Sequence, residues 1–362
     1  MQTVRRSVLS LATAGKEFTR SVAINSAAVV TNDESNLKSW KEIPGPSSLP
    51  IIGQLLHFLP RGSLHENFVT SVLYDQYGPI VKIGFFGSPS IVLLFDAEAS
   101  AQVLRSENLM PIRTTFQSLD YFRHNYYRQR GAAPNEPTGL VSDHGDVWKK
   151  FRSTVNPIML KPKTIKLYAN SLMEVAEDMV KRVSNTMTGT LYLLAKNPDK
   201  QKKLREEIIS DRQKRPYLKA CIKESMRMMP VVPGNLRVAT KEYNIFGYKI
   251  LKGTHVIFMH QALSNMDKHF PEPEKYIPER WITEKTDPLF HRNAHPFAWN
   301  PFGFGMRMCI GRRIAELEIE TFLAKVIENF EVEWFGPPLQ TRPSSLNYTV
   351  GPYNFIFKDV KK

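Results

Sequence analysis

A glycine-rich stretch at 302–313, FGFGMRMCIGRR, places one of the chain's two cysteines directly before a long amphipathic pattern. Its glycines, at 303, 305 and 311, allow a tight backbone turn and the close approach of a flat ligand. Cys309 lies just before the expected helix start, where unpaired N–H groups and the helix dipole favour a thiolate. Arg307, two residues earlier, is placed to pair with the anionic edge of a ligand.

The chemistry of this thiolate is limited by its isolation. No second Cys or His stands at metal-binding spacing from Cys309, which argues against a tetrahedral zinc site. A single thiolate suits an axial ligand of haem iron, where it favours O–O cleavage. An isolated cysteine in a glycine turn is more often a small buried residue. The complete pattern is far more specific than that cysteine: Phe302-x-x-Gly305-x-Arg307-x-Cys309-x-Gly311.

This loop resembles the haem-binding loop of the cytochrome P-450 family, and further motifs follow in that family's order. The stretch KESMR supplies a Glu-x-x-Arg pair, Glu224 and Arg227, on one face of a helix. The resemblance implies that Arg280, from the Pro-Glu-Arg-Trp segment at 278–281, joins them in a buried charge network around the haem loop. On its own, a Glu-x-x-Arg pair is a common solvated feature of helix surfaces.

A second group of basic residues resembles the family's contacts with the haem propionates. Trp148 and Arg152, four residues apart, share one helical face, and the resemblance assigns such a pair to a propionate. Arg237 and Arg307 resemble the other propionate partners. Each residue alone would more often be ordinary surface or core, but together they supply the positive ring that a buried dianion requires.

The resemblance therefore implies haem b as the cofactor, with its iron held by the Cys309 thiolate. It implies a haem-dependent monooxygenase that inserts one oxygen atom from O2 into an apolar small molecule. The fold implied is mainly α with a minor β portion, the cytochrome P-450 fold lacking several central helices.

Basic residues near the loop indicate the branch of the family. Arg312 and Arg313 follow the cysteine, while Lys219 and Lys223 lie four apart on one helical face. Both features resemble the mitochondrial branch, and in particular its insect members. There the electron donor is an acidic ferredoxin, which these side chains would attract. Either feature alone would more often be a solvated basic face.

The N-terminus supports the same branch. Its first 30 residues contain four basic residues against one acid and account for three of the 14 net positive charges. Serines and alanines with spaced basic residues predict a mitochondrial presequence over 1–35, the alternative being a disordered basic tail. No apolar run there approaches the ~20 residues of a spanning helix. With two cysteines, the chain also fits a reducing compartment.

The remaining positive charge requires a partner. No nucleic-acid motif or aromatic–basic ladder accompanies it, so nucleic acid is not expected. An acidic protein or an anionic membrane surface fits better. We therefore expect a mitochondrial location at the matrix-facing periphery of the inner membrane, an acidic ferredoxin-type donor, an apolar small-molecule substrate and peripheral membrane contact.

The elements that must position these residues form one domain over 36–362. Apolar periodicity predicts helices over 64–78, 97–107, 146–160, 165–183, 184–209, 216–230 and the stretch after Cys309, with a break near Pro198. A capping box of Ser63 and Glu66 is expected before the first of these. A hairpin is predicted over 79–96 and short strands over 235–259. Residues 110–140 resemble a long loop with short helices.

One family element is missing. The long helix across the far face of the haem, which carries an acid followed by threonine for proton delivery, has no counterpart in the sequence. The chain passes directly from an earlier helix to the residues that follow that motif, with the apparent internal deletion near Val183–Ser184. Thr186, Thr188 and Thr190 follow no acid and are interpreted as ordinary helix residues. The alternative function is thus a catalytically impaired haem-binding or ferredoxin-binding variant.

Overall fold

The computed structural model describes residues 37–59, 62, 64, 71–84, 90–113, 117–131, 133, 136–168, 185–210, 214–343 and 346–360. The expected presequence lies outside these ranges, as do Ser63, Glu66 and the Val183–Ser184 junction. The fold is mainly α with a minor β portion, as predicted. Within the described ranges, no helix is both long and apolar enough to cross a membrane.

The described helices agree with most of the predicted positions, whereas the helix expected over 165–183 lies largely outside the described ranges. In chain order they are α2 (Val72–Tyr77), α3 (Ala97–Arg105), α4 (Gln117–Gln129), α5 (Gly145–Met159), α6 (Pro162–Lys166), α8 (Asn185–Lys196), α9 (Pro198–Ser210), α10 (Pro216–Met228), α11 (His260–Ser264) and α12 (Arg312–Asn329). Short 3-10 turns include η5 (Pro278–Trp281) and η7 (Gly305–Arg307). Pro198 lies at the first position of α9, which confirms the predicted break, because proline is accepted there but not within a helix.

Helix α4 was not predicted as a long helix. It contains 13 residues within a stretch that the sequence suggested was mostly loop. Its residues lack an apolar period, so no buried stripe marks it. Contacts four residues apart support it instead: the Phe122 and Tyr126 rings lie 5.1 Å apart, and His124 Nδ1 lies 3.2 Å from the Asp120 carboxylate.

The strands form small sheets. They are β1 (Lys38–Ser39), β2 (Ile80–Ile83), β3 (Ile91–Leu94), β4 (Asn235–Val238), β5 (Tyr243–Ile245), β6 (Tyr248–Ile250), β7 (His255–Phe258), β8 (Phe330–Trp334), β9 (Gln340–Arg342), β10 (Tyr348–Val350) and β11 (Phe355–Asp359). The largest sheet has the order β2-β3-β7-β4. Strands β2 and β3 pair antiparallel, which confirms the predicted hairpin, whereas β3 and β7 pair parallel.

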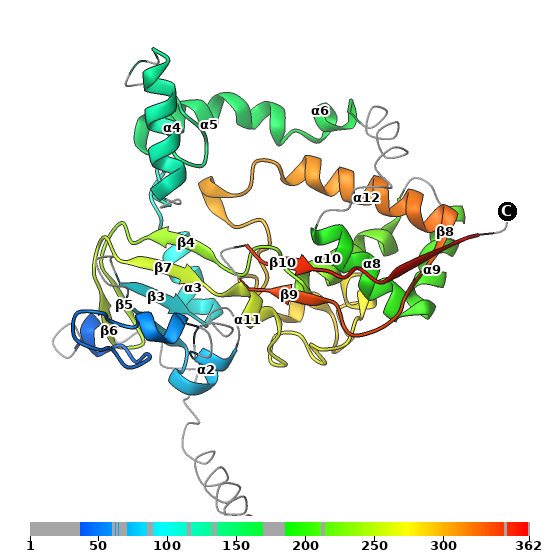
Figure 1. The fold of residues 1–362 in the computed structure, drawn as a ribbon, viewed down its shortest axis with the longest axis horizontal. Coiled ribbons are helices and arrows are strands. Elements are labelled where there is room, and N and C mark those ends of the chain that lie inside the picture. The colour runs from blue at the N-terminus through cyan, green and yellow to red at the C-terminus, as the bar shows by residue number, and fades with distance from the viewer. Residues whose placement is uncertain are drawn as a thin grey trace, which may run out of the picture.

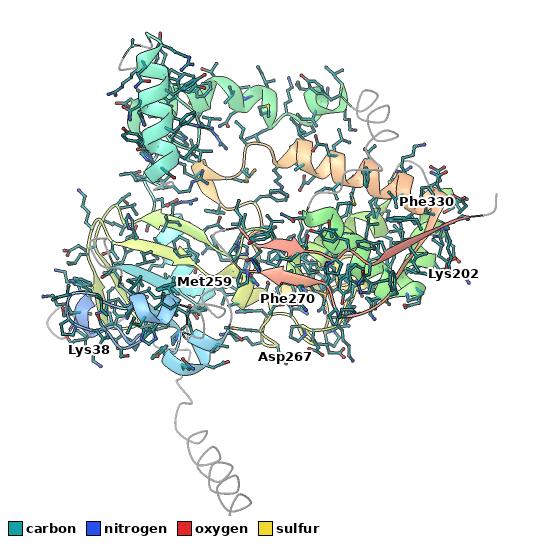
Figure 2. All side chains as sticks on the ribbon, viewed as in Figure 1. Lys38, Lys202, Met259, Asp267, Phe270 and Phe330 are labelled. Atoms are coloured by element: carbon teal, nitrogen blue, oxygen red, sulfur yellow. The ribbon has the colours of Figure 1, made fainter. Side chains whose placement is uncertain are left out.

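The four-stranded sheet and most of the helices occupy opposite ends of the molecule, and β8, β9 and β10 lie at the helical end (Figure 1). Sheet β2-β3-β7-β4 lies at one end with α3 and α2, while α8, α9 and α10 form a helical end packed under α12. Helices α5 and α6 run above α12, and α4 projects beside them. Figure 2 places the Lys38 side chain at the sheet end and Phe330 at the helical end.

The apolar face of helix α12 packs into the core in its second half and lines a cavity in its first half. Phe322, Leu323 and Val326 are buried in the helical core. Ala315 and Ile319, nearer the N-terminus, are only half-buried and line a cavity instead. The loop that contains Cys309 is therefore connected directly to a helix whose second half is fixed in the core.

Candidate functional site: a cavity at the Cys309 loop

A cavity of ≈ 370 Å³ lies above the Cys309 loop. Its walls come from the approach to α4, the residues before α5, α5 itself, the start of α8, the turn after α10 and the first half of α12. They are mostly apolar, with three arginines. The lining residues are Arg113, Leu140, Val141, Arg152, Thr186, Met226, Pro230, Val231, Val232, Asn235, Pro301, Phe302, Arg307, Met308, Cys309, Ile310, Ala315 and Ile319.

The loop holds Cys309 at this cavity by backbone geometry. Cys309 N donates a 2.8 Å hydrogen bond to the Phe302 carbonyl, which closes the loop on itself. Gly303 and Gly305 have φ of +73° and +68°, values that side chains disfavour. Gly311 has ordinary φ, but a Cβ added there would meet only the Cys309 Sγ, at 4.0 Å. Gly311 therefore leaves open the space beside the sulfur.

The two cysteines have opposite environments. Cys309 is exposed at the cavity, whereas Cys221 is buried in α10. Burial raises the pKa of the Cys221 thiol well above its usual range, so that thiol stays protonated and inert. Among the described residues, Cys309 is thus the thiol that can act as a ligand.

One face of α5 and the residue that precedes it contact the loop. His144, Trp148 and Arg152 are four residues apart, so their side chains follow one another along the helix. Arg152 Nη2 donates a 2.6 Å hydrogen bond to the carbonyl of Met308, next to the cysteine. The Arg307 guanidinium carbon lies 3.7 Å from the centre of the buried Trp148 ring, a cation–π contact.

Arg307 is buried and surrounded by neutral acceptors. Its Nε donates to the Pro111 carbonyl at 2.8 Å, and its Nη1 to the Leu140 carbonyl at 3.3 Å. Its Nη2 donates to the Asp143 carbonyl and lies within hydrogen-bond distance of His144 Nδ1, both at 3.1 Å. None of these acceptors is a carboxylate.

Four arginines gather at this site: Arg113, Arg152 and Arg307 line the cavity, and Arg237 lies behind the loop. Within the described ranges, Arg237 alone among the four forms an ion pair, from Nε to Glu107 at 2.8 Å. Burial, reinforced by the other three arginines, lowers the pKa of Arg307 to about 9. Burial also lowers the pKa of Arg113 and Arg152, and the Cys309 thiolate opposes this effect on both.

The arrangement fits a flat dianion above a thiolate. Three buried or half-buried guanidinium groups have no carboxylate partner among the described residues, and an unpaired buried charge is costly. Trp148 Nε1 and Arg152 Nε are buried and have no hydrogen-bond partner among the described residues. Such orphaned donors indicate a missing acceptor. The apolar walls and the open space beside Gly311 suit the face and edge of a macrocycle, so the residues fit haem.

Arg237 takes a different place from the other predicted propionate residues. It does not line the cavity; its Nη2 donates to the Phe304 carbonyl at 3.1 Å, and its charge is paired with Glu107. Gly305 also lies away from the cavity wall, and a Cβ there would face the Glu107 carboxylate at 3.8 Å. Both residues shape the loop from behind.

Glu224, Arg227 and Arg280 form a fully buried cluster. Glu224 Oε1 accepts from Arg227 Nη2 at 2.8 Å and from Arg280 Nε at 3.0 Å. Glu224 Oε2 accepts from Arg227 Nε and from Trp281 Nε1, at 3.0 and 2.8 Å. Arg227 and Arg280 also donate to backbone carbonyls of 264–275. The cluster binds α10 to η5 and the long segment before the Cys309 loop.

The basic residues proposed for partner docking lie on α10 and at the start of α12. Arg312 and Arg313 both pair with Glu316, at 2.8 and 3.3 Å, and Lys219 lies 4.0 Å from Glu320. Burial, opposed by Glu316, lowers the pKa of Lys223, whose ammonium lies over Trp281. The face is therefore basic but contains two acids.

Sequence reasoning missed several residues at this site. Arg113 lies in a stretch without period, so nothing in its spacing singled it out. His144 was passed over, although its four-residue spacing from Trp148 was a readable signal. Thr186 was interpreted as an ordinary helix residue, yet it lines the cavity at the start of α8.

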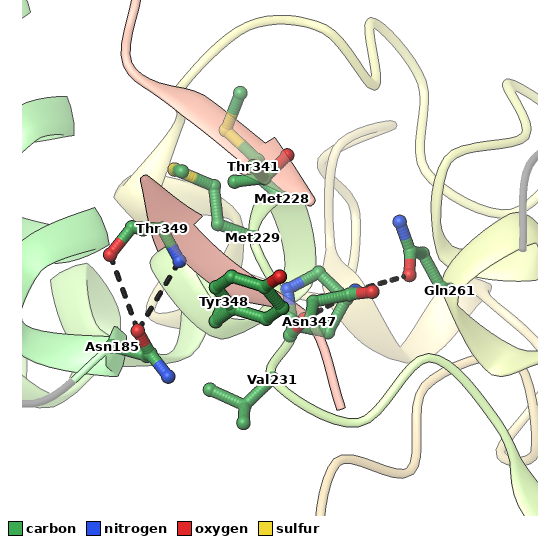
Figure 3. Close-up of a pocket in the computed structure, with 10 residues that line it drawn as sticks. Asn185, Met228, Met229, Val231, Gln261, Thr341, Asn347, Tyr348 and Thr349 are labelled. Carbon is green, nitrogen blue, oxygen red and sulfur yellow. Dashed lines mark hydrogen bonds between the residues drawn. The ribbon is translucent and has the colours of Figure 1, made fainter. Parts of the chain in front are cut away.

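A smaller pocket, ≈ 50 Å³, adjoins this cavity through their shared residues Pro230 and Val231 (Figure 3). Asn347 Nδ2 donates to the Pro230 carbonyl and to Gln261 Oε1, both at 2.8 Å. Asn185 Oδ1 accepts from both the backbone and the hydroxyl of Thr349. By its volume, this pocket holds no more than a few water-sized groups.

Comparison with known proteins identifies the relatives of this chain. The cytochrome P450 family model matches residues 43–185 and 181–357. Probable cytochrome P450 49a1 of Drosophila melanogaster is 26% identical over 508 residues, covering 93% of this chain and 86% of the relative. Cytochrome P450 CYP12A2 of Musca domestica is 26% identical, covering 89% and 92%. Probable cytochrome P450 12b2, mitochondrial, of Drosophila melanogaster is 24% identical, covering 82% and 85%.

Proposed function

The chain belongs to the cytochrome P450 family, and we propose that it is a mitochondrial haem-thiolate monooxygenase served by an acidic ferredoxin. Family membership makes it an oxidoreductase with haem iron on a cysteine thiolate, which activates O2 when bound. The observation that carries the proposal is the exposed Cys309 thiol in an apolar cavity lined by three arginines that have no carboxylate partner in the part of the chain that the structure describes.

The roles of the individual residues follow from their positions. Cys309 would hold the haem iron through its thiolate, and Gly311 would keep the space beside its sulfur clear. Arg113, Arg152 and Arg307 neutralise the two propionates, and Trp148 Nε1 donates to one of them. Residues of the apolar wall, such as Val231 and Ile319, exclude water and accept an apolar substrate.

The scaffold roles are equally specific. The Phe302 carbonyl accepts a hydrogen bond from the Cys309 N–H, while Arg237 and Gly305 support the loop from the side away from the cavity. Glu224, Arg227 and Arg280 fix the segment that leads into the loop. These contacts hold the thiol in one position, which a metal ligand requires.

The described cavity wall contains few groups that could deliver protons. Among the described residues that line the cavity, none is a carboxylic acid or a histidine, and Thr186 is the one hydroxyl. This observation favours the second candidate function, a protein that binds haem or the ferredoxin but turns over slowly. Thr186, half-buried at the start of α8, is the residue best placed to hold a proton-carrying water.

The shortened family domain over 36–362 has support from the comparisons. The two segments matched by the family model meet at 181–185, and the match to the first relative extends over 508 residues although this chain has 362. A deletion near Val183–Ser184 explains both. Sequencing mature transcripts across the Val183 codon tests it: an inserted segment there would identify an incomplete gene model, and an uninterrupted junction a genuine shortened form.

The proposed location and partners are those of the mitochondrial branch of the family. Relatives carry the word mitochondrial in their names, and the basic, serine-rich N-terminus suits a presequence over 1–35. We place the protein at the matrix-facing periphery of the inner membrane, with an apolar substrate. Fusing residues 1–35 to a fluorescent protein tests the targeting, with Arg5→Glu/Arg6→Glu as the control that should abolish import.

Carbon monoxide spectroscopy tests the central proposal. The reduced, carbon-monoxide-bound protein should give a thiolate-type Soret band, and Cys309→Ala should lose it. Cys221→Ala, the control, should retain it. Absence of haem uptake by the wild-type chain would contradict both candidate functions. Product formation with a ferredoxin, its reductase and NADPH then separates the monooxygenase from the slow haem-binding form.

A further inference from the structure

His144 stands at a position where its side chain does nothing for its own helix. It is the N-cap residue of α5, yet its side chain makes no capping hydrogen bond. Serine, threonine, asparagine or aspartate would satisfy a free N–H there and stabilise the helix by roughly 1 kcal/mol. The imidazole is turned instead toward the Cys309 loop, where its Nδ1 lies 3.1 Å from Arg307 Nη2.

The contact completes the set of acceptors around Arg307. A guanidinium has five N–H donors. The carbonyls of Pro111, Leu140 and Asp143 each accept one, and His144 Nδ1 is in place to accept a second donor of Nη2. One Nη1 donor then remains for an anion, and Trp148 below fixes the plane of the group.

The surroundings of the imidazole favour the neutral form that can accept. Arg307 and Arg113 oppose its protonation, while Asp120 of α4 and Asp143 favour it. His124, Arg128 and Glu136 line the same polar pocket of ≈ 250 Å³. Partial burial is the largest effect, followed by Arg307, and the pKa of His144 is lowered. A neutral imidazole with Nδ1 unprotonated is the tautomer that accepts from Arg307.

We propose that His144 is a positioning residue for the cofactor: its Nδ1 accepts from Arg307 Nη2 and directs the guanidinium's remaining donor toward a haem propionate. The inference rests on the proposed haem site. It assigns no catalytic role to His144, which acts only through Arg307. Because His144 is on the surface side of Arg307, it holds the arginine without entering the cavity.

The test compares haem with a cofactor that lacks the carboxylates. Haem loss from the full chain to excess apomyoglobin is timed for wild type, His144→Leu and His144→Asn. Leucine fills the site and removes the acceptor, whereas the asparagine Oδ1 restores an acceptor near Nδ1. Loss should be at least about tenfold faster in His144→Leu, the value of one hydrogen bond to a charged group, and close to wild type in His144→Asn.

The same measurement with iron protoporphyrin IX dimethyl ester separates positioning from general damage. The ester cannot accept an ionic contact from Arg307, so wild type and His144→Leu should lose it at equal rates. His124→Leu, in the same pocket but without contact to Arg307, is the matched control and should match wild type with both cofactors.

Three results would overturn the inference. Equal haem loss from wild type and His144→Leu rejects it while leaving the proposed haem site intact. An equal acceleration with haem and with the ester shows a structural defect, not a propionate effect. Failure of wild type to take up haem at all rejects the proposed function together with the inference.

Discussion

Arg152 Nη2 donates a 2.6 Å hydrogen bond to the backbone carbonyl of Met308, across 156 residues of sequence. The bond joins α5 to the residue immediately before the proposed iron ligand. Arg152 also lines the cavity and has a buried Nε without a partner. One guanidinium thus fixes the backbone beside Cys309 and presents a free donor and a positive charge to the space above it.

Replacing Arg152 should weaken haem retention more than it weakens the fold. In Arg152→Gln, one bond to Met308 and one charge near the propionates disappear, and we expect haem loss about tenfold faster, equivalent to ~1.4 kcal/mol. Transfer of haem to apomyoglobin measures the rate. Lys150→Gln, an exposed change on the same helix, is the control. Rates equal to that control would show that Arg152 makes no contact with the cofactor.

Removing the Glu224 charge should destabilise the whole domain. Arg227 and Arg280 would be left buried without their carboxylate, and breaking such a cluster costs about 3–5 kcal/mol. Glu224→Gln should therefore lower the free energy of unfolding by this amount in urea denaturation. Glu333→Gln, which breaks the exposed pair with Lys358, should cost less than about 1 kcal/mol. A similar loss in both variants would contradict a special role for the buried cluster.

Local chemistry in the sequence was sufficient to predict many of the elements. Asp96 caps α3 through the Ala99 N–H at 2.9 Å, a signal contained in adjacent residues. The 79–96 hairpin and the end of α8 before Pro198 were equally local. Helix α4 was missed because it has no buried stripe, and pattern reasoning depends on that stripe.

The site was less accessible to prediction than the fold. The motif around Cys309 is contiguous, so the resemblance located it at once. Arg113 and His144 approach Arg307 only after chain segments more than 150 residues apart have packed together. Their residue types are common and their spacing from Cys309 is arbitrary. The spacing of His144 from Trp148 indicates a shared helix face, but it does not predict the contact with Arg307.

Mild acid should destabilise the protein through His260. This side chain is fully buried, its Nε2 has no partner among the described residues, and burial lowers its pKa to about 4. Its unfolded pKa is about 6.5, so the unfolded chain takes up a proton first as pH falls. Stability is complete above about pH 6.5 and is lost progressively down to about pH 4, by roughly 3 kcal/mol.

The His260 contribution can be isolated by difference. His260→Gln cannot titrate, so the gap between its free energy of unfolding and that of wild type should change by this amount between pH 7 and pH 4. A gap that stays constant across this range would exclude His260 as the origin of the acid sensitivity.

Charge changes on α10 and α12 should tune the affinity for an acidic ferredoxin. Lys219 and Arg313 have about half of their side chains exposed, at 48% and 46%, whereas Lys223 is held over Trp281. Lys219→Glu and Arg313→Glu should each raise the Kd several-fold at low ionic strength, and less at high salt, since exposed charges are screened. Titration of the ferredoxin at two salt concentrations measures both effects.

Glu316, one of the two acids on this face, allows a second test of ferredoxin docking. Glu316 pairs with both Arg312 and Arg313 and neutralises part of their charge. Glu316→Gln releases two arginines and removes a repulsive carboxylate, so binding of the ferredoxin should become tighter, by about threefold at low salt. Lys249→Glu, on β6 at the sheet end, should leave the Kd unchanged. Weaker binding by Glu316→Gln would mean that the ferredoxin docks elsewhere on the molecule. So would a Lys249→Glu variant that raised the Kd as much as Arg313→Glu.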